Sequence, residues 1–564
     1  MLIIIAGAFY KFDNKEGYEM KRKLFAILLI LALVFSLAAC NKTQDNSPAA
    51  GDQGTSASPG NSAAPSESAA PGGSAAPGNS AAPADPGKMV EITAAFSAVP
   101  NSLDPVTEDT NLTMSICFHI YDKLFELDAI TLERIPGVAK SWKEIDAMNW
   151  EFEIDLDMKF QNGDPLTMDD VVYSFTRLLD FAKSADTGKQ IASITYEGNI
   201  LKMVATEENA AIIPRAVATA AIVNKAYIEA NGDDAIYLNP IGTGPYKVAQ
   251  FTPGDIVVLE TWDGYPYAKP QIDKITFVQI PEAQNRYIAV ESGQVQYAAL
   301  VTQMEMNLAE DNNSLGTLQV PTSNRILAFG FNCERAPFDN INVRRGILHA
   351  VDRNSFVALN GGGRTAMKGL LFPGFDTYYS DPPGLPEYDM AKAKELLEGE
   401  GINPSNPLDV VLLYFPQNAD PGLEMVQSSL KSLGVNLILD LVEFSVYLTR
   451  EGPGEFDMFY TSLPNRGGHP LTDLDRFDYS FVGSRDLVRW QNAEYQELAT
   501  KIRASTDLNE QLTLIAKANE ILGYEAPEYG VFVTPINCVM DNKLSGVTVR
   551  ADLIQSLRNA TYTG

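Results

Sequence analysis

The sequence predicts an α/β protein whose sheets are partly parallel. From Met89 onward the spacing of apolar residues switches repeatedly between the period of a strand and the period of a helix. Roughly 475 residues remain from that point to the end of the chain, which is enough for two or three lobes. Strands that alternate with helices are typical of a sheet that contains parallel neighbours.

The apolar pattern predicts individual strands and helices along the chain. Residues 150–156 alternate apolar with polar side chains, as a half-buried strand does. Thr167 and Asp170 have the spacing of a capping box, which predicts a helix that begins there. Further on we expect a buried strand, a helix that ends before a glycine, and two more strands: residues 410–414, 422–433, 435–442 and 456–460.

Residues 20–39 resemble the signal peptide of a bacterial lipoprotein. A basic head precedes about a dozen apolar residues. The small residues Ala38 and Ala39 then stand directly before Cys40. The resemblance implies that Cys40 carries lipid and that the rest of the chain works outside the cytoplasmic membrane. A transmembrane helix or a buried core helix is the alternative, but the apolar run is short for a span and a long polar stretch follows it.

Two further segments flank the signal peptide. Residues 1–19 precede the basic head, so we expect translation to begin at Met20 and residues 1–19 to be a misassigned leader. Residues 40–88 consist almost wholly of Ala, Ser, Gly, Pro and Asn, which predicts a disordered tether. A flexible segment of this length has a mean reach of about 40 Å. This reach suits a protein held on a membrane and favours a Gram-positive surface.

Composition excludes several classes of function. The formal net charge of −29 repels phosphates and anionic lipid, so we expect no nucleic-acid partner and membrane contact through the lipid alone. Besides Cys40 there are three cysteines, Cys117, Cys333 and Cys538, without paired spacing. Histidines are equally few and widely spaced. The sequence therefore predicts no disulfide framework, no metal site, no cofactor and no catalytic residues.

Several phrases, in this order along the chain, resemble the extracellular solute-binding proteins of peptide and nickel type ABC importers, known as solute-binding protein family 5. The resemblance covers essentially residues 90 to 545. The phrases are Ser102-Leu103-Asp104-Pro105, Ile120-Tyr121-Asp122-Lys123-Leu124, Pro136-Gly137-Val138-Ala139 with Trp142, Lys159 to Phe175, Gly242-Thr243-Gly244-Pro245-Tyr246, Phe331 to Arg353, and Ala391-Lys392-Ala393-Lys394-Glu395-Leu396-Leu397.

The resemblance implies a two-lobed periplasmic-binding-protein-like fold of type II, in the large three-subdomain variety, with mixed sheets and hinge crossovers. A ligand would be enclosed between the lobes, and the closed form would be delivered to a membrane permease. We expect lobe I at residues 89–322, with a subdomain at about 137–235, lobe II at 323–533, and a return to lobe I at 534–564. We also expect a monomer.

The loop after the expected strand 456–460 departs from the peptide-binding pattern. Ligands of open α/β sheets sit beyond the carboxyl ends of strands. Peptide-binding members carry near here a Trp and an Asp that pairs with the α-ammonium group of the ligand. Laid on without gaps, these positions fall on Leu463 and Arg466. Arg466 would then offer a bidentate fork to an anion, with Asn465 and His469 adding hydrogen bonds. The alternative is a solvated Arg466 in a shifted loop.

Other candidate ligand contacts are few. They are the Ser97-Ala98 step, Asn101, and Tyr460, the one aromatic residue that we place between the lobes. Two glycine-rich stretches are better explained by a structural role than by ligand binding. Gly242 to Pro245 predicts a tight turn before a strand. Residues 360–364 (Asn-Gly-Gly-Gly-Arg) predict a mobile loop, with an anion-binding nest as the alternative.

The sequence therefore predicts a lipid-anchored substrate-binding protein of an ABC importer that captures an oligopeptide, a dipeptide or a similar small solute. The first alternative is a ligand-sensing member of the same fold that is not coupled to import. The second is an extracytoplasmic hydrolase, but no GxSxG motif and no paired histidine and carboxylate motif is visible.

Overall fold

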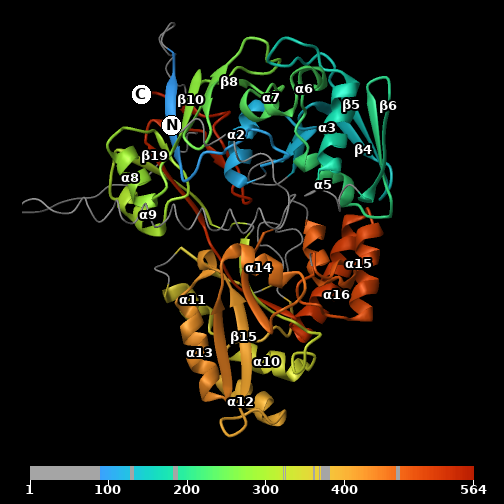
Figure 1. The fold of residues 1–564 in the computed structure, drawn as a ribbon, viewed down its shortest axis with the longest axis vertical. Coiled ribbons are helices and arrows are strands. Elements are labelled where there is room, and N and C mark those ends of the chain that lie inside the picture. The colour runs from blue at the N-terminus through green and yellow to red at the C-terminus, as the bar shows by residue number, and fades with distance from the viewer. Residues whose placement is uncertain are drawn as a thin grey trace, which may run out of the picture. The chain divides into compact units, whose positions relative to one another are not determined.

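The computed structural model describes residues 89–108, 110–127, 133–181, 189–321, 323, 325–359, 363–367, 369, 382–464, 470–484 and 486–564 (Figure 1). The expected leader, signal peptide and tether lie outside this part of the chain. Within it, no helix has both the length and the apolar character needed to cross a membrane.

A seven-stranded mixed sheet forms the centre of lobe I, with the strand order β12-β19-β11-β1-β10-β9-β8. β1 runs parallel to both of its neighbours, β10 and β11, and the other pairs are antiparallel. The strands are β1 Glu91–Phe96, β8 Tyr246–Thr252, β9 Ile256–Thr261, β10 Lys274–Gln279, β11 Tyr297–Ala298, β12 Leu315–Val320 and β19 Ile536–Asp541. The helices of this part are α2 Asn111–Ile120, α6 Lys225–Asn231, α7 Asp233–Leu238, α8 Ala283–Glu291 and α9 Gln303–Glu310.

A second, four-stranded antiparallel sheet in lobe I has the order β4-β5-β7-β6. Its strands are β4 Ala139–Glu144, β5 Asn149–Ile154, β6 Ile191–Glu197 and β7 Ile200–Ala205, and it is accompanied by α3 Met168–Asp180, α5 Ile212–Thr219 and the short pair β2 Phe125–Leu127 and β3 Arg134–Pro136. Trp150, Phe152 and Ile154 of β5 are fully buried, because alternate residues of a strand face the same side.

Lobe II is built on a six-stranded mixed sheet with the order β14-β18-β13-β17-β15-β16. β15 runs parallel to β16 and β17, while β13 is antiparallel to β17 and β18. The strands are β13 Arg325–Phe331, β14 Thr365–Ala366, β15 Leu408–Tyr414, β16 Val435–Leu441, β17 Met458–Pro464 and β18 Glu528–Val533.

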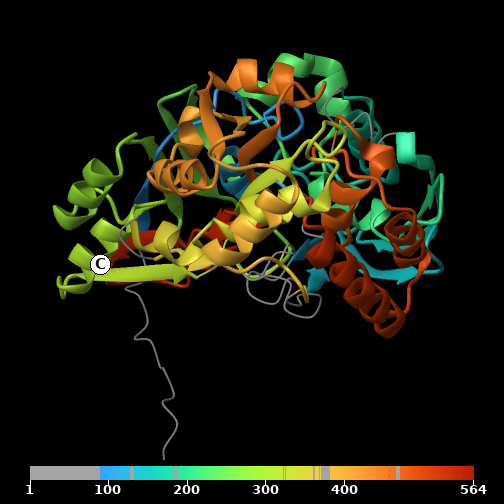
Figure 2. The same ribbon diagram turned by 90° about the horizontal axis from the view of Figure 1, so that it is seen from below.

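Helices surround this sheet, and α15 and α16 pack side by side as a pair (Figures 1 and 2). The α-helices are α10 Ile341–His349, α11 Arg353–Leu359, α12 Met390–Gly399, α13 Gly422–Ser432, α14 Phe444–Glu451, α15 Ala493–Ala504 and α16 Leu508–Glu525. Three 3-10 helices are η3 Pro416–Asn418, η4 Pro470–Phe477 and η5 Tyr479–Phe481.

The chain passes twice between the seven-stranded and the six-stranded sheet. It leaves lobe I between β12 and β13 and returns between β18 and β19. β12 pairs with β19 on one side of the crossing, and β13 pairs with β18 on the other. After β19 the chain stays with lobe I in four two-residue strands: β20 Leu544–Ser545, β21 Thr548–Val549, β22 Gln555–Ser556 and β23 Thr561–Tyr562.

The expected elements are confirmed with small shifts at their ends. β5 covers residues 150–154 of the predicted alternating strand, but Leu156 lies beyond its end and is 39% exposed. Thr167 and Asp170 form both bonds of the capping box at the start of α3. β15, α13 and β16 lie where the apolar pattern places them, and β17 begins two residues later than predicted. The parallel pairs of β15 confirm the partly parallel sheet.

The turn at Gly242 and Gly244 precedes β8 as predicted, but the reason for its glycines is different. Neither residue has a positive φ angle. A Cβ atom on Gly242 would instead lie 2.2 Å from the carbonyl oxygen of Ile120, and one on Gly244 would lie 2.7 Å from it. The glycines are needed because two backbone segments approach each other closely, not because the turn is left-handed.

His119 joins the C-terminal segment to α2 inside lobe I. The N–H of Leu557 donates to Nε2 of His119 at 3.0 Å, so the proton lies on Nδ1, which donates to the carbonyl oxygen of Ser115 at 2.9 Å. The ring is fully buried between Tyr246 and Phe277. Burial, together with the positive charge of Arg558, lowers the pKa of His119 to about 3.

We expect His119 to make the stability of lobe I fall as the pH falls. In the unfolded chain His119 takes up a proton below about pH 6.5, whereas in the folded state its lowered pKa keeps it neutral. Below that pH the free energy of unfolding therefore falls by about 1.4 kcal/mol per pH unit because of His119. The His119→Gln variant lacks this loss. Urea unfolding at pH 7.5 and pH 5.0 should show that the stability gap between wild type and variant narrows by about 2 kcal/mol at the lower pH. A gap of constant size would show that His119 titrates normally in the folded protein.

Candidate functional site

The strand ends of lobe II that face the crossovers lie at one edge of its sheet. Arg325 at the start of β13 pairs with Pro464 at the end of β17, and Ile326 pairs with Val533 at the end of β18. The chain enters β13 and leaves β18 at this edge. The loop that follows β17, which holds the predicted anion-binding residues, therefore starts at the junction with lobe I.

The sheet of lobe I presents a matching edge to the same crossovers. Val320, at the end of β12, pairs with Ile536, at the start of β19. The parallel strands β1, β10 and β11 end on this side of the sheet because β11 is antiparallel to β19. Ligands of mixed α/β sheets bind beyond such strand ends. In both lobes, the sheet edge beyond which ligands of α/β folds bind thus lies at the same junction.

The predicted residues of lobe I follow the end of β1. Ser97 is half-buried, and Ala98 and Asn101 are exposed. The backbone N–H of Asn101 donates to the carboxylate of Glu108 at 3.1 Å, which holds the segment in place. The side chain of Asn101 points toward Gly254, in the turn between β8 and β9. These residues lie at the junction edge of the sheet with their polar groups accessible.

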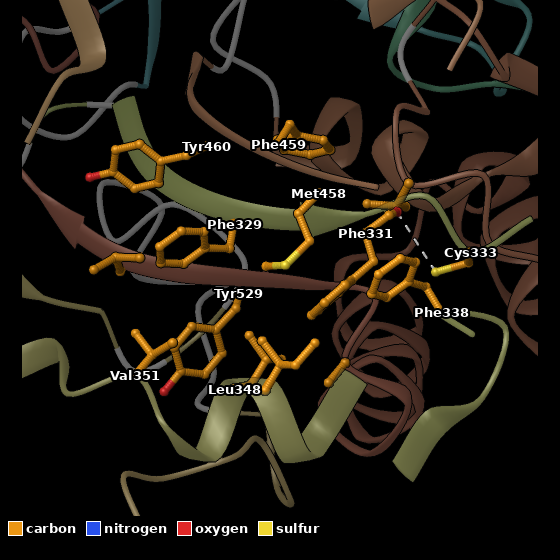
Figure 3. Packing of buried hydrophobic residues seen from close by; sticks show 14 of the residues in the cluster. Phe329, Phe331, Cys333, Phe338, Leu348, Val351, Met458, Phe459, Tyr460 and Tyr529 are labelled. Atoms are coloured by element: carbon orange, nitrogen blue, oxygen red, sulfur yellow. Dashed lines mark hydrogen bonds between the residues drawn. The ribbon is translucent and has the colours of Figure 1, made fainter. Parts of the chain in front are cut away.

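The predicted residues of lobe II divide into one that the structure describes and three that it does not. Asn465, Arg466 and His469 lie outside the described residues. Tyr460 is fully buried, and its ring packs against Phe329 at a centroid distance of 4.9 Å (Figure 3). Its hydroxyl group has no hydrogen-bond partner among the described residues. Burial raises the pKa of Tyr460 well above its usual value, so the hydroxyl stays protonated and remains a donor.

The sequence patterns did not predict the ion pair between Arg364 and Asp420 in lobe II. Nη1 of Arg364, which directly precedes β14, lies 2.7 Å from Oδ2 of Asp420. The guanidinium group also stacks on the ring of Phe532 at 4.2 Å. The side chain of Asp420 is 3% exposed and that of Arg364 is 23% exposed. The only sequence signal was the glycine run before Arg364, which also fits a simple loop.

Asp420 and its neighbours are fixed by the start of α13. Oδ1 of Asp420 accepts from the backbone N–H of Gly422 at 2.8 Å. Two residues before Asp420, the amide of Asn418 donates to the hydroxyl of Thr461 in β17 at 3.3 Å. An Asp at a helix start is favoured because its carboxylate satisfies free backbone N–H groups. The carboxylate that faces Arg364 is therefore held by the backbone.

The chain that follows the loop 465–469 is anchored by buried ion pairs. Arg503 of α15 pairs with Asp475 at 3.3 Å and also with Asp478. Arg476 pairs with Glu528 of β18 at 3.3 Å. Burial raises the pKa of Glu528, and Arg476 opposes that rise. Such buried pairs are costly to break because one charge would be left uncompensated. Residues 475, 476 and 478 are thus attached to α15 and β18.

A second group of buried charges lies in lobe I under the C-terminal segment. Arg558 pairs with Asp122 at 2.8 Å, and Nζ of Lys123 donates to the carbonyl oxygen of Ala218 at 2.6 Å. Burial raises the pKa of Glu126 and lowers the pKa of Lys123, so both are pushed toward their neutral forms. A small cavity beside Lys123 has room for about one water molecule, which is too little for a solute.

The described residues contain no group of three or more His, Cys, Asp or Glu side chains that would suit a metal ion. Cys117, Cys333 and Cys538 are buried free thiols. Burial raises the pKa of all three, to about 12 for Cys333, so they are inert neutral groups. In the described part of the chain the cysteines behave as small apolar residues.

The family model of the bacterial extracellular solute-binding proteins, family 5 (middle region), matches residues 133–484, which is more than half of the chain. The chain belongs to this family. This solute-binding protein is therefore the substrate-binding component of an ABC importer, and its family is one of binding proteins and not of enzymes.

Individual relatives agree with this assignment. The solute-binding protein is 25% identical over 443 residues to the dipeptide-binding protein of Escherichia coli K12, which covers 72% of this chain and 82% of that relative. It shares the fold of a dipeptide-binding protein of Pseudoalteromonas sp. SM9913, solved with Met-Leu, with a TM-score of 0.71, 21% identity, and coverage of 84% of this chain and all of the other. The NikA protein of Staphylococcus aureus, solved with Ni(L-His)2, gives a TM-score of 0.67 at 18% identity, again over 84% of this chain and all of the other. The predicted periplasmic-binding-protein-like fold is confirmed.

We expect removal of the Tyr460 hydroxyl to leave the ligand-free protein as stable as wild type, or more stable by about 1 kcal/mol, because a buried hydroxyl without a partner costs free energy. The control is Tyr495→Phe. The hydroxyl of Tyr495 is also buried but donates to the carbonyl oxygen of Leu474 at 2.8 Å, so its loss should cost about 1 kcal/mol. Urea unfolding compares the two variants. If Tyr460→Phe lost as much stability as Tyr495→Phe, the Tyr460 hydroxyl would have a hydrogen-bond partner in the folded protein.

Proposed function

We propose that the protein captures a dipeptide, an oligopeptide or a similar small solute outside the cytoplasmic membrane and delivers it to an ABC permease. The observation that carries this proposal is the match, over 72% of the chain, to a relative that is named a dipeptide-binding protein. The nickel-histidine complex of NikA is consistent with a broader class, because it too presents amino-acid carboxylates. No catalytic step is part of this function.

The ligand would bind at the junction between the two lobes. Ser97 and Asn101 follow strand β1 on one side. On the other side Tyr460 lies in strand β17, and residues 465–469 follow that strand. The two crossovers would serve as the hinge, because short connections can absorb the backbone rotation while the paired strands on either side stay rigid. Closure then buries the solute and creates the form that the permease accepts.

The loop after β17 would select the charge of the ligand. An Arg at position 466 presents donors where peptide-binding relatives present an acceptor-only carboxylate. Asn465 and His469 would add hydrogen bonds to the same group. We therefore propose that the ligand presents an anionic group to this loop, and that a free ammonium group is not bound there.

The chain would be held at the membrane by lipid on Cys40 and would work as a monomer on the outer face of the cytoplasmic membrane, in a Gram-positive envelope. The support is the signal-like segment 20–39 and the long polar segment after it. A tether of mean reach about 40 Å lets the receptor move between solvent and permease. Membrane attachment through lipid also agrees with the net charge of −29.

Calorimetry tests the ligand class with three probes: Met-Leu, an equimolar pool of unblocked dipeptides, and Ni(L-His)2. We expect the pool to bind and small-angle scattering to show a smaller radius of gyration in its presence, because closure shortens the molecule. Binding of Ni(L-His)2 without any binding of the peptides would overturn the peptide proposal. Binding without a change in the scattering profile would contradict lobe closure.

Replacement of Cys40 by Ser tests the lipid anchor. We expect the variant to appear in the medium or periplasm, with its circular dichroism spectrum and melting temperature unchanged, because the attachment point is separated from the folded lobes by the tether. Cell fractionation and mass spectrometry of the purified protein provide the measurements. A variant that lacks lipid and still sediments with membranes would disprove anchoring through Cys40.

A further inference from the structure

The two lobes touch each other at a place away from the crossovers. The backbone N–H of Ala210, between β7 and α5 of lobe I, donates to the carbonyl oxygen of Arg503 in α15 of lobe II at 2.8 Å. Figure 1 shows α5 and α15 on the other side of the molecule from α9 and β19, which adjoin the crossovers. A rotation about the crossovers moves the parts far from them the most. The contact at Ala210 is therefore one that wide opening of the lobes would break.

Each side of this contact offers a backbone group that its own helix leaves without a partner. The last carbonyl groups of a helix have no intrahelical N–H to accept from, and Arg503 lies in the last turn of α15. Ala210 directly precedes Ala211, the N-cap of α5, so its N–H also lies outside the helical hydrogen bonds. The negative end of one helix dipole thus meets the positive end of the other. One hydrogen bond satisfies both groups.

The side chain that follows Ala210 is buried against lobe II. Ala211 is 5% exposed and belongs to the apolar cluster that forms the core of lobe II. Its neighbour Ile212 belongs to the separate cluster beside the four-stranded sheet of lobe I. The apolar cores of the two lobes therefore meet at the step from Ala211 to Ile212, and opening the lobes there would expose the methyl group of Ala211 to water.

Both sides of the contact are held in place within their own lobe. On lobe I, the side chain of Asn209 accepts from the N–H of Ala211 at 3.0 Å, and its own N–H donates to the carbonyl oxygen of Ala147 at 3.3 Å. On lobe II, the buried side chain of Arg503 pairs with Asp475 at 3.3 Å, and such a pair is costly to break. The donor and the acceptor are thus ordered before the lobes meet, which lowers the entropic cost of the contact.

We propose that this contact is a latch: the start of α5 and the end of α15 hold the lobes together and set the fraction of the solute-free protein that is closed. The inference rests on the proposed function, because it assumes lobes that open and close around a solute. It adds a contact that controls affinity without touching the solute. Where only the closed form binds, the apparent dissociation constant is the intrinsic constant divided by the closed fraction.

The closed fraction is measured without solute, from single-molecule energy transfer between a label on each lobe. One label is attached to Asp157→Cys, just after β5, and the other to Glu395→Cys in α12. The native side chains at these positions are 96% and 67% exposed. The full chain also carries Cys40→Ser, and the remaining three thiols are buried and do not take up label.

Two variants break the latch, and a third is a matched control. Ala211→Gln places a long polar side chain where the methyl group meets lobe II, and Ala210→Pro removes the N–H donor. The control is Thr219→Gln, because Thr219 is exposed and its hydroxyl group donates within α5, to the carbonyl oxygens of Arg215 and Ala216. We expect each latch variant to lower the ratio of closed to open molecules about tenfold, and the control to leave it unchanged.

Calorimetry with the pool of unblocked dipeptides then measures affinity on the same proteins. The affinity of each latch variant should fall by the same factor as its closed fraction, because the contacts with the solute are unchanged. Thr219→Gln should bind as wild type does. A closed fraction that falls without a matching loss of affinity would overturn the inference, since the contact would then not control binding.

The remaining outcomes separate the latch from the proposed function. If wild type shows no closed molecules without solute, or if both latch variants keep its closed fraction, the latch is wrong, whether or not peptides bind. If the pool fails to bind wild type, peptide capture is overturned and the energy-transfer measurement alone decides the latch. Circular dichroism checks that each variant is folded. If Ala210→Pro does not fold, Ala211→Gln decides.

Discussion

The antiparallel pairing of the two crossing segments is the constraint on which the rest of the molecule depends. On the lobe I side Val320 pairs with Ile536, and on the lobe II side Ile326 pairs with Val533. The ladders therefore stop within a few residues of the crossing on both sides. Hydrogen-bonded strands resist bending, whereas the short unpaired links between them do not. The same pairing places the carboxyl ends of β17 and β18 beside the end of β1, so that the hinge and the candidate ligand contacts share one place.

Buried ion pairs also hold the parts of each lobe that support this junction. Arg503 with Asp475 and Asp478 fixes the chain that precedes α15, and Arg558 with Asp122 fixes the C-terminal return in lobe I. Burial of an ion pair contributes little net stability, but breaking one leaves a charge that is expensive to bury. Such pairs act as alignment devices. Under the proposed function, they would keep each lobe rigid while the links between β12 and β13 and between β18 and β19 bend.

The helices, the strands and the family could be predicted from the sequence. The contacts between side chains at the junction edge of lobe II could not. Alternation along β5 and the Thr167 and Asp170 capping box are local signals, and the structure confirms both. The partner of Arg364 is 56 residues away, in a loop that no periodicity marks. Pairing between distant loops depends on strand order, which a single sequence does not contain. The turn at Gly242 shows the same limit, since its glycine is required by the carbonyl oxygen of a residue more than a hundred positions earlier.

The charge at the junction gives a physical reason to expect two basic groups on lobe II. Arg364 already has its charge compensated by Asp420, so it can stay in a partly dry site without a ligand. In the proposed role of Arg466 the compensating charge would come from the ligand itself. A compensated Arg can bind a carboxylate before closure, and an uncompensated Arg gains most from an anion after closure. Under the proposed function, an anionic group of the solute would therefore favour the closed form most strongly through its contact with the loop after β17.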